Sequence, residues 1–553
     1  MDVATVRGRA SRVSALALFA ISTACGGGPE RETGGTIVVG MRYDFGAFNP
    51  IVNGDLYTGE VINYALFTPL IRYDADLNVV PHLAESWEEQ GDTAVVFRLR
   101  RDVNWHDGER VTAHDVAFTF ERAKAPESAS LIGDAFINDV ASVEVIDSFM
   151  VRFVYERPHA QALEDFWWAP APRHLLEDVP AAELRNAPFN RQPTGSGPYR
   201  LVEWRARERV VLERNEDYAP SLGGPPAVQR IVFRVVPEAS TMLTELVTGG
   251  VHVDVPVLPD QVDRIESEPS LRLFAYPGRT VYYVGWNNAR PPFDDARVRR
   301  GLALAIDRQQ IIDALLAGQG SAATGPLPPW HPLFPSQVAP LEHAPVEADR
   351  LLSEAGWIDR DNDGVRENAA GEPLRFLLLA ADDALRRSVV EILEGQFRRI
   401  GARAEIRVTE FQSMLQQHRS RDFDAVFTNW VLDNFRASAA PFALFHSSQA
   451  AEPGSANRST VNIPALDRLI EQGGASTDPG QQREIWAEFT AVLQREQPVT
   501  FMFWLNELAG VRTEVNGVEM DPRGELLTIR QWTLNRGTAA RAALSGTALT
   551  ESR

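Results

Sequence analysis

Strand-like and helix-like hydrophobic patterns alternate along this chain. Between residues 95 and 99, hydrophobic side chains occupy every second position, which predicts a half-buried strand. Segments 143–146 and 149–155 are also strand-like, and they flank the turn-forming pair Asp147-Ser148. This arrangement predicts a β-hairpin.

Helical patterns are clearest in the C-terminal half. Hydrophobic residues recur at helical spacing over 385–400, and Gly401 follows as a stop signal. Asp478-Pro479 has the chemistry of an N-cap followed by a first-turn proline, and Pro498 ends the helix that begins there. Residues 499–504 then form a strand-like run. Mixed strands and helices over this length predict α/β layers with more than one sheet.

The composition is that of a globular protein. The chain has 553 residues, of which 44% are hydrophobic and 24% charged, and this length predicts about three domains. A formal charge of −20 argues against a nucleic-acid partner, because phosphate contacts need basic surfaces. Lys124 is the single lysine and lies outside any G-K-[ST] sequence, so we expect neither a phosphate loop nor a Schiff base.

The N-terminus has the layout of an export signal. Basic residues precede an apolar stretch, 13–22, that is too short to span a bilayer, and small residues then lead to Cys25. This cysteine resembles the modified residue of a bacterial lipobox, although Ser22 stands where leucine is usual. We expect 1–24 to be an export signal and 25–35 a lipidated cysteine with a flexible tether. Plain secretion, with cleavage at the same place, is the alternative.

An ordered series of short motifs runs through the rest of the chain. No single motif is specific, but the series resembles the signature of the family 5 extracellular solute-binding proteins, the receptors of peptide, nickel and related ABC importers. The resemblance covers residues 36–535. The motifs are Pro81–Trp87, Val96–Arg100, Val103–Gly108, Val111–Phe120, Pro193–Tyr199, Leu212–Asn215, Thr248–Asp254, Pro291–Arg299, Ala305–Arg308, Ala355–Trp357 and Asn457–Asp467.

The resemblance implies an α/β, two-lobed periplasmic-binding-protein-like fold of type II, in its three-domain variant, with a hinge and an interlobe cleft. Two chain crossings, near Tyr282–Asn288 and Trp504–Glu507, would form the hinge. The expected parts are a main domain of lobe 1 at 36–69, 173–285 and 507–540, an inserted domain of lobe 1 at 70–172, lobe 2 at 286–506, and a disordered tail at 541–553.

The resemblance also implies where a ligand binds. In peptide-binding members, a Trp-x-x-Asp segment holds the amino group of the peptide, and residues 427–434 match it here. An ammonium buried in a closed cleft requires an anionic partner, so Asp433 is the expected one and Asn434 adjoins it. The backbone of Asn429, Trp430 and Val431 would pair with an extended ligand as an added strand. The alternative is that Asp433 caps a surface turn.

Two aromatic residues near the first crossing are further candidates. Relatives contribute aromatic cleft residues there, so Tyr283 and Trp286 are expected to line the cleft or, with equal weight, to pack in a lobe core. After Asn434, the sequence Phe435–Ala439 departs from the Asp/Glu-Pro pair that is common in the family.

Two polar segments suggest metal sites but have structural explanations. His106, Asp107, His114 and Asp115 suggest a metal site, but Thr112-x-x-Asp115 fits a helix capping box better. Asp359–Gly364 resembles the start of a calcium loop, yet Ala370 stands where such a loop needs a bidentate glutamate, so a polar turn is favoured. We therefore expect no metal and no cofactor.

Together these features predict an extracytoplasmic substrate-binding lipoprotein of an ABC importer. It would be a monomer, tethered to the membrane by lipid, that captures di- or oligopeptides and delivers them to a permease and its ATPase subunits. A nickel chelate, an opine or an oligosaccharide as ligand, or a sensor that does not transport, remain open. We do not expect an enzyme, because the ten histidines show no pair at triad or ligand spacing and no nucleophile motif occurs.

Overall fold

A computed structural model describes residues 34–130, 132–133, 136–157, 159, 161–432, 435–452 and 454–535. The expected export signal, Cys25, Asp433, Asn434 and the expected C-terminal tail lie outside the described residues.

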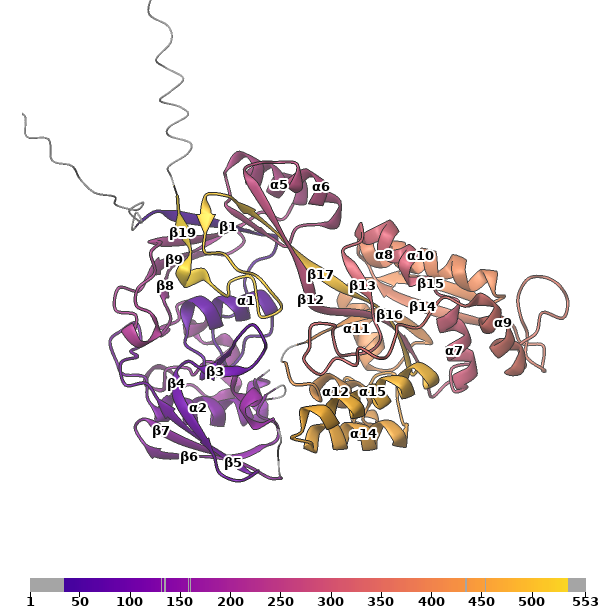
Figure 1. Ribbon diagram of the computed structural model, residues 1–553, viewed down its shortest axis with the longest axis horizontal. Coiled ribbons are helices and arrows are strands. Elements are labelled where there is room, and N and C mark those ends of the chain that lie inside the picture. Colours follow the sequence, from indigo (N-terminus) through magenta and orange to yellow (C-terminus); the bar gives the residue numbers. More distant parts are fainter. Residues whose placement is uncertain are drawn as a thin grey trace, which may run out of the picture.

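One large sheet extends through both halves of the molecule (Figure 1). Two long antiparallel strands stand at its centre and connect the halves, and β13 adds to one of them. In spatial order the strands are β15 (Arg403–Thr409), β14 (Arg375–Ala381), β16 (Ala425–Val431), β12 (Leu271–Trp286), β17 (Val499–Arg512), β11 (Val253–Val255), β1 (Thr36–Met41), β10 (Arg230–Val235), β9 (Arg209–Arg214) and β8 (Tyr199–Arg205), with β13 (Gly320–Ala322) beside β17.

We call β12 and β17 the crossing strands, residues 34–270 with 513–535 the first lobe, and residues 287–498 the second lobe. These names follow the strands in the structure. The domain boundaries expected from the sequence stay a prediction.

The first lobe contains a second, separate sheet, made of β4 (Ala84–Glu89), β5 (Ala94–Leu99), β7 (Met150–Tyr155) and β6 (Val140–Asp147). The strand expected at 95–99 lies in β5, and the expected hairpin is confirmed, since β6 and β7 pair antiparallel around Asp147-Ser148. Further elements of the first lobe include α1 (Leu56–Glu60), the π-helical η1 (Val61–Leu66), β2 (Ile71–Tyr73), β3 (Val79–Pro81), α2 (Ala113–Lys124), α4 (Arg173–Leu176), η4 (Ala181–Asn186), α5 (Ala239–Thr248), α6 (Val262–Glu266), β18 (Val515–Asn516) and β19 (Thr533–Leu534).

Helix α2 begins with the capping box that the sequence predicts. The Thr112 N–H and hydroxyl both donate to Asp115 Oδ2, at 2.8 and 2.9 Å. Asp115 Oδ1 accepts the Arg173 N–H, so this carboxylate is fully used in structural bonds. His106 is held by the backbone of Gly195 and Gly197, and burial lowers its pKa to about 4. The segment 106–115 is therefore structural, as expected.

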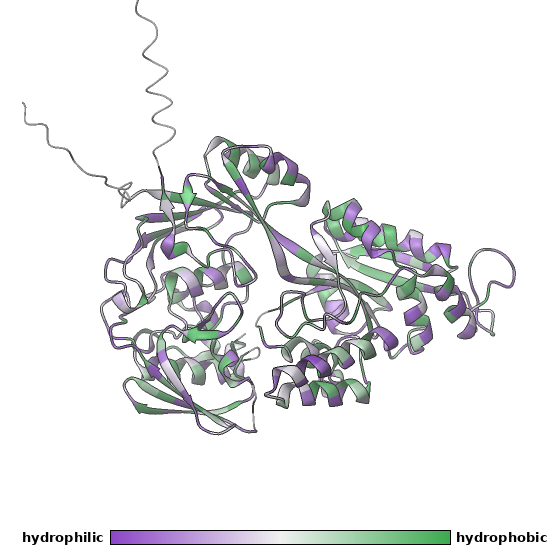
Figure 2. Cartoon of the chain, viewed as in Figure 1, coloured by the Kyte–Doolittle hydropathy of each residue, from purple (hydrophilic) through white to green (hydrophobic). Residues whose placement is uncertain are grey.

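In the second lobe, helices cover both faces of the sheet (Figure 1), and in Figure 2 they alternate green and purple as amphipathic helices do. The two helices expected from the sequence are confirmed, with Asp383 and Asp478 accepting N–H groups of their first turns. The helices are α7 (Ala296–Leu304), α8 (Arg308–Leu316), α9 (Pro345–Glu354), α10 (Ala384–Arg399), α11 (Phe411–Arg419), α12 (Ala439–Phe445), α13 (Ser447–Ala451), α14 (Pro464–Ala475) and α15 (Pro479–Glu496).

The segment at Gly195–Gly197 lies directly on the backbone that leaves η1. The Gly197 N–H donates to the Leu66 carbonyl at 2.8 Å. A Cβ on Gly197 would meet the Leu66 carbonyl carbon at 2.5 Å and the Phe67 nitrogen at 2.8 Å. Because both are backbone atoms, only glycine fits at this position.

We expect Gly197→Ala to lower the free energy of unfolding by about 1–3 kcal/mol, because the added methyl group overpacks against backbone that cannot move aside. Chemical denaturation of the purified protein measures this change. Gly395→Ala in α10 is the control: its Cβ would meet nothing within 4 Å, so stability should hold or rise by up to about 1 kcal/mol. Equal stability of Gly197→Ala and the parent would contradict the prediction.

Candidate functional site

The crossing strands are irregular where they pass from one lobe to the other. Their pairing runs from Leu271↔Arg512 to Pro277↔Asn506 and resumes, after a register shift, at Val281↔Trp504. The break on β17 coincides with the expected crossing near Trp504–Glu507, and the break on β12 precedes the expected Tyr282–Asn288. Regular ladder bonds are missing between these points, so the strands bend most easily here.

Strand β16 lies beside β12 and has an open edge next to this break. The Leu432 N–H donates to the Arg279 carbonyl at 3.0 Å, which continues the antiparallel ladder. In such a ladder the groups of alternate residues point to opposite sides, so Asn429 and Val431 direct their N–H and C=O groups away from β12. Within the described residues, β14 pairs with β16 at Ala425–Phe427 and leaves this part of the edge unpaired.

A basic side chain stands beside the open edge. Arg386, in the first turn of α10, donates to Asn429 Oδ1 at 2.5 Å and also contacts the Asp383 carboxylate. Its guanidinium lies 5.4 Å from the ring centre of Tyr282. Arg386 lies at the carboxyl end of the parallel strands β14, β15 and β16. The chain continues from β14 to β15 on one side and then to β16 on the other side, so the strand order reverses here. Ligands bind at such a reversal in open α/β sheets.

Buried acids gather on the first-lobe side of the break. Glu60, 4% exposed, accepts the N–H groups of Glu525 and Leu526 through Oε2, at 2.8 and 3.2 Å. Its other oxygen lies 3.7 Å from a guanidinium nitrogen of Arg279, which is 5% exposed. Burial first, then the nearby Glu525, raise the pKa of Glu60 well above its usual value, and Arg279 opposes this shift. Burial and Glu525 also raise the pKa of Glu507 to about 7.

A pocket opens next to these charges on the first lobe. Glu60 and Arg279 lie in its wall, and Tyr64, Phe136, Trp167 and Trp168 are its aromatic residues. It is lined by Pro50, Asn53, Gly54, Asp55, Leu56, Gly59, Glu60, Ile62, Asn63, Tyr64, Ile132, Phe136, Trp167, Trp168, Ala169 and Arg279.

The segment that follows β16 reaches across to the first lobe. Phe435 is 4% exposed, with its ring 4.9 Å from that of Tyr73 and 5.2 Å from that of Trp167. Arg436 Nη1 donates to Asp165 Oδ1 at 2.7 Å. The side chain of Asp165 is 2% exposed and also accepts the Tyr155 hydroxyl at 3.0 Å. These contacts join the two lobes directly beside the open edge of β16.

The candidate residues from the sequence fall in different places. The half-buried Trp430 packs against the second-lobe core, while Asn429 and Val431 lie on the open edge. Tyr283 is 4% exposed in one hydrophobic cluster of that lobe. Trp286 is fully buried in the other and donates its indole N–H to Thr500 at 2.9 Å. Both aromatic residues therefore pack in the core of the second lobe and do not line a cleft surface. Asp433 and Asn434 lie outside the described residues.

Sequence reasoning missed the charged residues of the cleft. Glu60, Arg279 and Asp165 were not among its candidates, although each lies within a largely apolar stretch of sequence. A charge inside an apolar run is a usable signal, because such a group is buried with the run and needs a partner.

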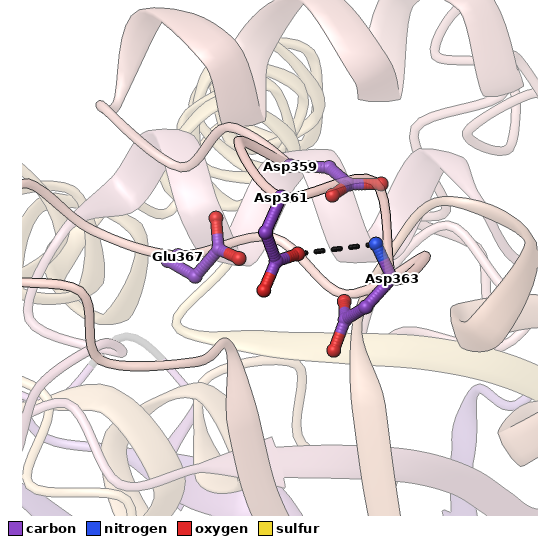
Figure 3. A group of neighbouring side chains, drawn as sticks. All are labelled: Asp359, Asp361, Asp363 and Glu367. Atoms are coloured by element: carbon purple, nitrogen blue, oxygen red, sulfur yellow. Dashed lines mark hydrogen bonds between the residues drawn. The ribbon is translucent and has the colours of Figure 1, made fainter.

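The acidic loop at 359–367 lies in the second lobe, between α9 and β14. Asp359, Asp361, Asp363 and Glu367 bring carboxylate oxygens within 4.8 Å of one another, so they are the described residues that could hold a metal ion. Figure 3 shows Asp361 accepting the Asp363 N–H, at 3.1 Å. Asp359 and Asp363 likewise accept the N–H groups of Gly364 and Val365. These bonds are those of the polar turn that the sequence favours.

No helix in the described ranges is both long and apolar enough to cross a bilayer.

Comparison with known proteins identifies the chain's relatives. Residues 78–452 match the family described as "Bacterial extracellular solute-binding proteins, family 5 Middle". The oligopeptide-binding protein AppA of Bacillus subtilis is 27% identical over 513 residues, covering 91% of this chain and 92% of that protein. The dipeptide-binding protein of Escherichia coli is 26% identical over 499 residues, with coverage of 86% and 91%.

Solved structures agree with these sequence matches. Bacillus subtilis AppA in complex with a nonapeptide superposes with a TM-score of 0.77 at 27% identity, over 92% of this chain and 100% of the other. NikA from Brucella suis in complex with Fe(III)-EDTA has a TM-score of 0.79 at 23% identity, over 91% and 100%, and supports the fold alone.

We expect Arg436→Ala to favour a more open arrangement of the lobes. Without the guanidinium, the buried Asp165 loses its charged partner from the other lobe and keeps the contacts of the Tyr155 hydroxyl and the His159 ring. This loss costs up to about 3–5 kcal/mol unless the lobes separate and water reaches the carboxylate. Small-angle scattering of the purified protein should therefore show a larger radius of gyration than for the parent.

Arg173→Ala is the matched control, because Arg173 pairs with Glu177 at 2.9 Å in an ion pair that is nearly half exposed. Its scattering curve should equal that of the parent. An unchanged radius for Arg436→Ala as well would show that the Asp165 pair does not hold the lobes together.

Proposed function

The chain belongs to family 5 of the bacterial extracellular solute-binding proteins, and we propose that it captures peptides between its two lobes for an ABC importer. Members of this family are solute-binding transport proteins with a two-lobed type II periplasmic-binding fold, and this chain has that α/β fold. The observation that carries the proposal of a peptide ligand is the unpaired edge of β16 at Asn429 and Val431.

An open strand edge inside a cleft suits a ligand that has a backbone of its own. Asn429 and Val431 each offer one N–H and one C=O, which an extended peptide matches without any demand on its side chains. A nickel chelate or a sugar has no such repeat of donors and acceptors. The edge therefore favours a peptide over the other ligands that this fold can hold.

We propose that Asp433 binds the amino group of the peptide, with Asn434 beside it. The preceding residue, Leu432, is bonded to Arg279 on the crossing strand, and the following Phe435 packs against the first lobe. The described residues on both sides of Asp433 thus border the space between the lobes. A carboxylate at this point supplies the counter-charge that a desolvated ammonium requires.

A peptide held here would touch both lobes. Its backbone would lie along β16, while the contacts of Phe435 and Arg436 with the first lobe form next to its amino end. Ligand binding then favours the joined arrangement by the difference in affinity between the joined and separated states. A permease and its ATPase subunits are the partners that would receive the ligand.

We further propose that Cys25 carries a lipid that holds the protein, as a monomer, at the outer face of the membrane. The support is the sequence before it: a short apolar stretch followed by small residues and a cysteine.

We expect Asp433→Ala to weaken the binding of free-amine peptides by about 100-fold or more, because the ammonium loses its anionic partner. Calorimetric titration with tri- to pentapeptides, after native mass spectrometry has identified any co-purified ligand, measures the loss. N-acetylated peptides should bind the parent protein as weakly as free peptides bind the variant.

Asp422→Ala is the control for this experiment. Asp422 precedes the same strand, and its side chain is 77% exposed, so binding should be unaffected. Equal affinities for free and acetylated peptides would refute the amine role, and binding of nickel chelates or sugars alone would refute the peptide assignment.

We expect Cys25→Ala to move the exported protein from the membrane fraction to the soluble fraction, because two or more acyl chains are needed for stable anchoring and the variant has none. Cell fractionation measures the distribution. A parent protein that is already soluble would instead favour plain secretion.

A further inference from the structure

Three carboxylates and one guanidinium come together where the lobes meet. Glu60, Glu525 and Glu507 come from α1, the C-terminal segment of the first lobe and β17, and Arg279 on β12 is the cation that offsets them. Arg279 lies nearest Glu60, at 3.7 Å. Two negative charges are therefore in excess if all three acids are ionised.

The acids are also short of hydrogen-bond donors. Glu60 and Glu525 are 4% and 6% exposed, yet Glu60 Oε1 and Glu525 Oε2 accept no hydrogen bond from the described residues. Glu525 Oε1 accepts the Tyr276 hydroxyl at 2.7 Å. Buried carboxylate oxygens are normally hydrogen-bonded. The side chains of Glu60 and Glu525 are close enough for one to donate to the other when it holds a proton, so when both are ionised neither of these two oxygens has a donor among the described residues.

The surroundings suit an organic cation and not a metal ion. Glu60 and Arg279 lie in the wall of the first-lobe pocket, with the aromatic rings of Tyr64, Phe136 and Trp167. Aromatic faces attract guanidinium and ammonium groups. In the described part of the chain, carboxylate oxygens converge within metal-binding range at the loop 359–367 and not at these acids. Glu507, in turn, is partly exposed and close enough to Glu525 to feel its charge.

We propose that Glu60, Glu507 and Glu525 form a subsite for a positively charged side chain of the ligand, a guanidinium or an ammonium. This inference rests on the proposed function, since it assigns a side-chain preference to a peptide. The subsite lies one strand away from the open edge, because Arg279 is the residue that pairs with Leu432 at the end of β16. A side chain near the amino end of a peptide on that edge would reach it.

The test is calorimetric titration of the purified parent protein with tripeptides that carry arginine, its neutral isostere citrulline, lysine or norleucine at each position in turn. At one position, arginine should bind about 10- to 100-fold more tightly than citrulline, the gain of a charged hydrogen-bonded pair. Glu507→Gln, which keeps the side-chain shape, should bring this ratio to within about twofold of unity. Glu208→Gln is the control, since its side chain is 58% exposed on the first lobe, and it should keep the full ratio.

A pH series separates this subsite from other sources of preference. The pKa of Glu507 is about 7 because of burial and Glu525, against the opposing effect of Arg279, and Tyr57 and Tyr282 face it as well. Only the ionised form pairs with a cation, so the arginine-to-citrulline ratio should rise from about pH 5.5 to about pH 8.5. In Glu507→Gln this part of the rise should disappear.

The outcomes distinguish the two proposals. Equal affinities for arginine and citrulline peptides at every position would overturn the subsite but leave peptide capture intact. The three acids would then bind protons and no cationic side chain. A preference that Glu507→Gln does not reduce would also overturn it. Failure of every peptide to bind, charged or neutral, would overturn the proposed function itself.

Discussion

The hydrogen-bonded pair of crossing strands is the constraint on which the rest of the structure depends. β12 and β17 carry one sheet from the first lobe into the second, so the lobes are fixed relative to each other wherever the ladder is regular. The ladder is irregular at Pro277–Val281 and again at Tyr282–Tyr283, and the longer break, at Pro277–Val281, is where the pair bends most easily. Everything placed beside that stretch, from the edge of β16 to Glu60, lies where small changes in strand direction move the lobes most.

The same constraint explains why charge gathers there. The sheet runs through both lobes. Between the lobes, the hydrophobic core of neither one covers it. Arg279 and Glu507 occupy these positions on the two strands, and their partners come from the first lobe. Polar groups so placed are shielded from water but are not surrounded by a core, which makes their interactions strong and their pKa values sensitive to what fills the space.

Local features were predictable from the sequence because neighbouring residues determine them. The capping box at Thr112, the cap at Asp478 and the hairpin at Asp147 each follow from contacts within a few positions. The acidic group was not predictable, since Glu60 and the Glu525 N–H that it binds are 465 positions apart. Tyr283 and Trp286 show a different limit. They belong to separate hydrophobic clusters, and one cluster lies on each side of the second-lobe sheet. Because side chains on both faces of β12 are buried, the alternation of residues along the strand does not distinguish a cleft position from a core position.

The pairing of Arg436 with Asp165 also affects the electrostatic potential at the surface of the molecule. In the joined arrangement the guanidinium neutralises Asp165 and lies 3.8 Å from Asp139, while Glu164 stands nearby. If the lobes separate, Arg436 departs with the second lobe, and these acids are left along the rim of the first. The first lobe of a separated molecule then has a more negative rim than that of a joined one. A membrane partner with a basic docking face can therefore distinguish the two by electrostatic potential as well as by outline.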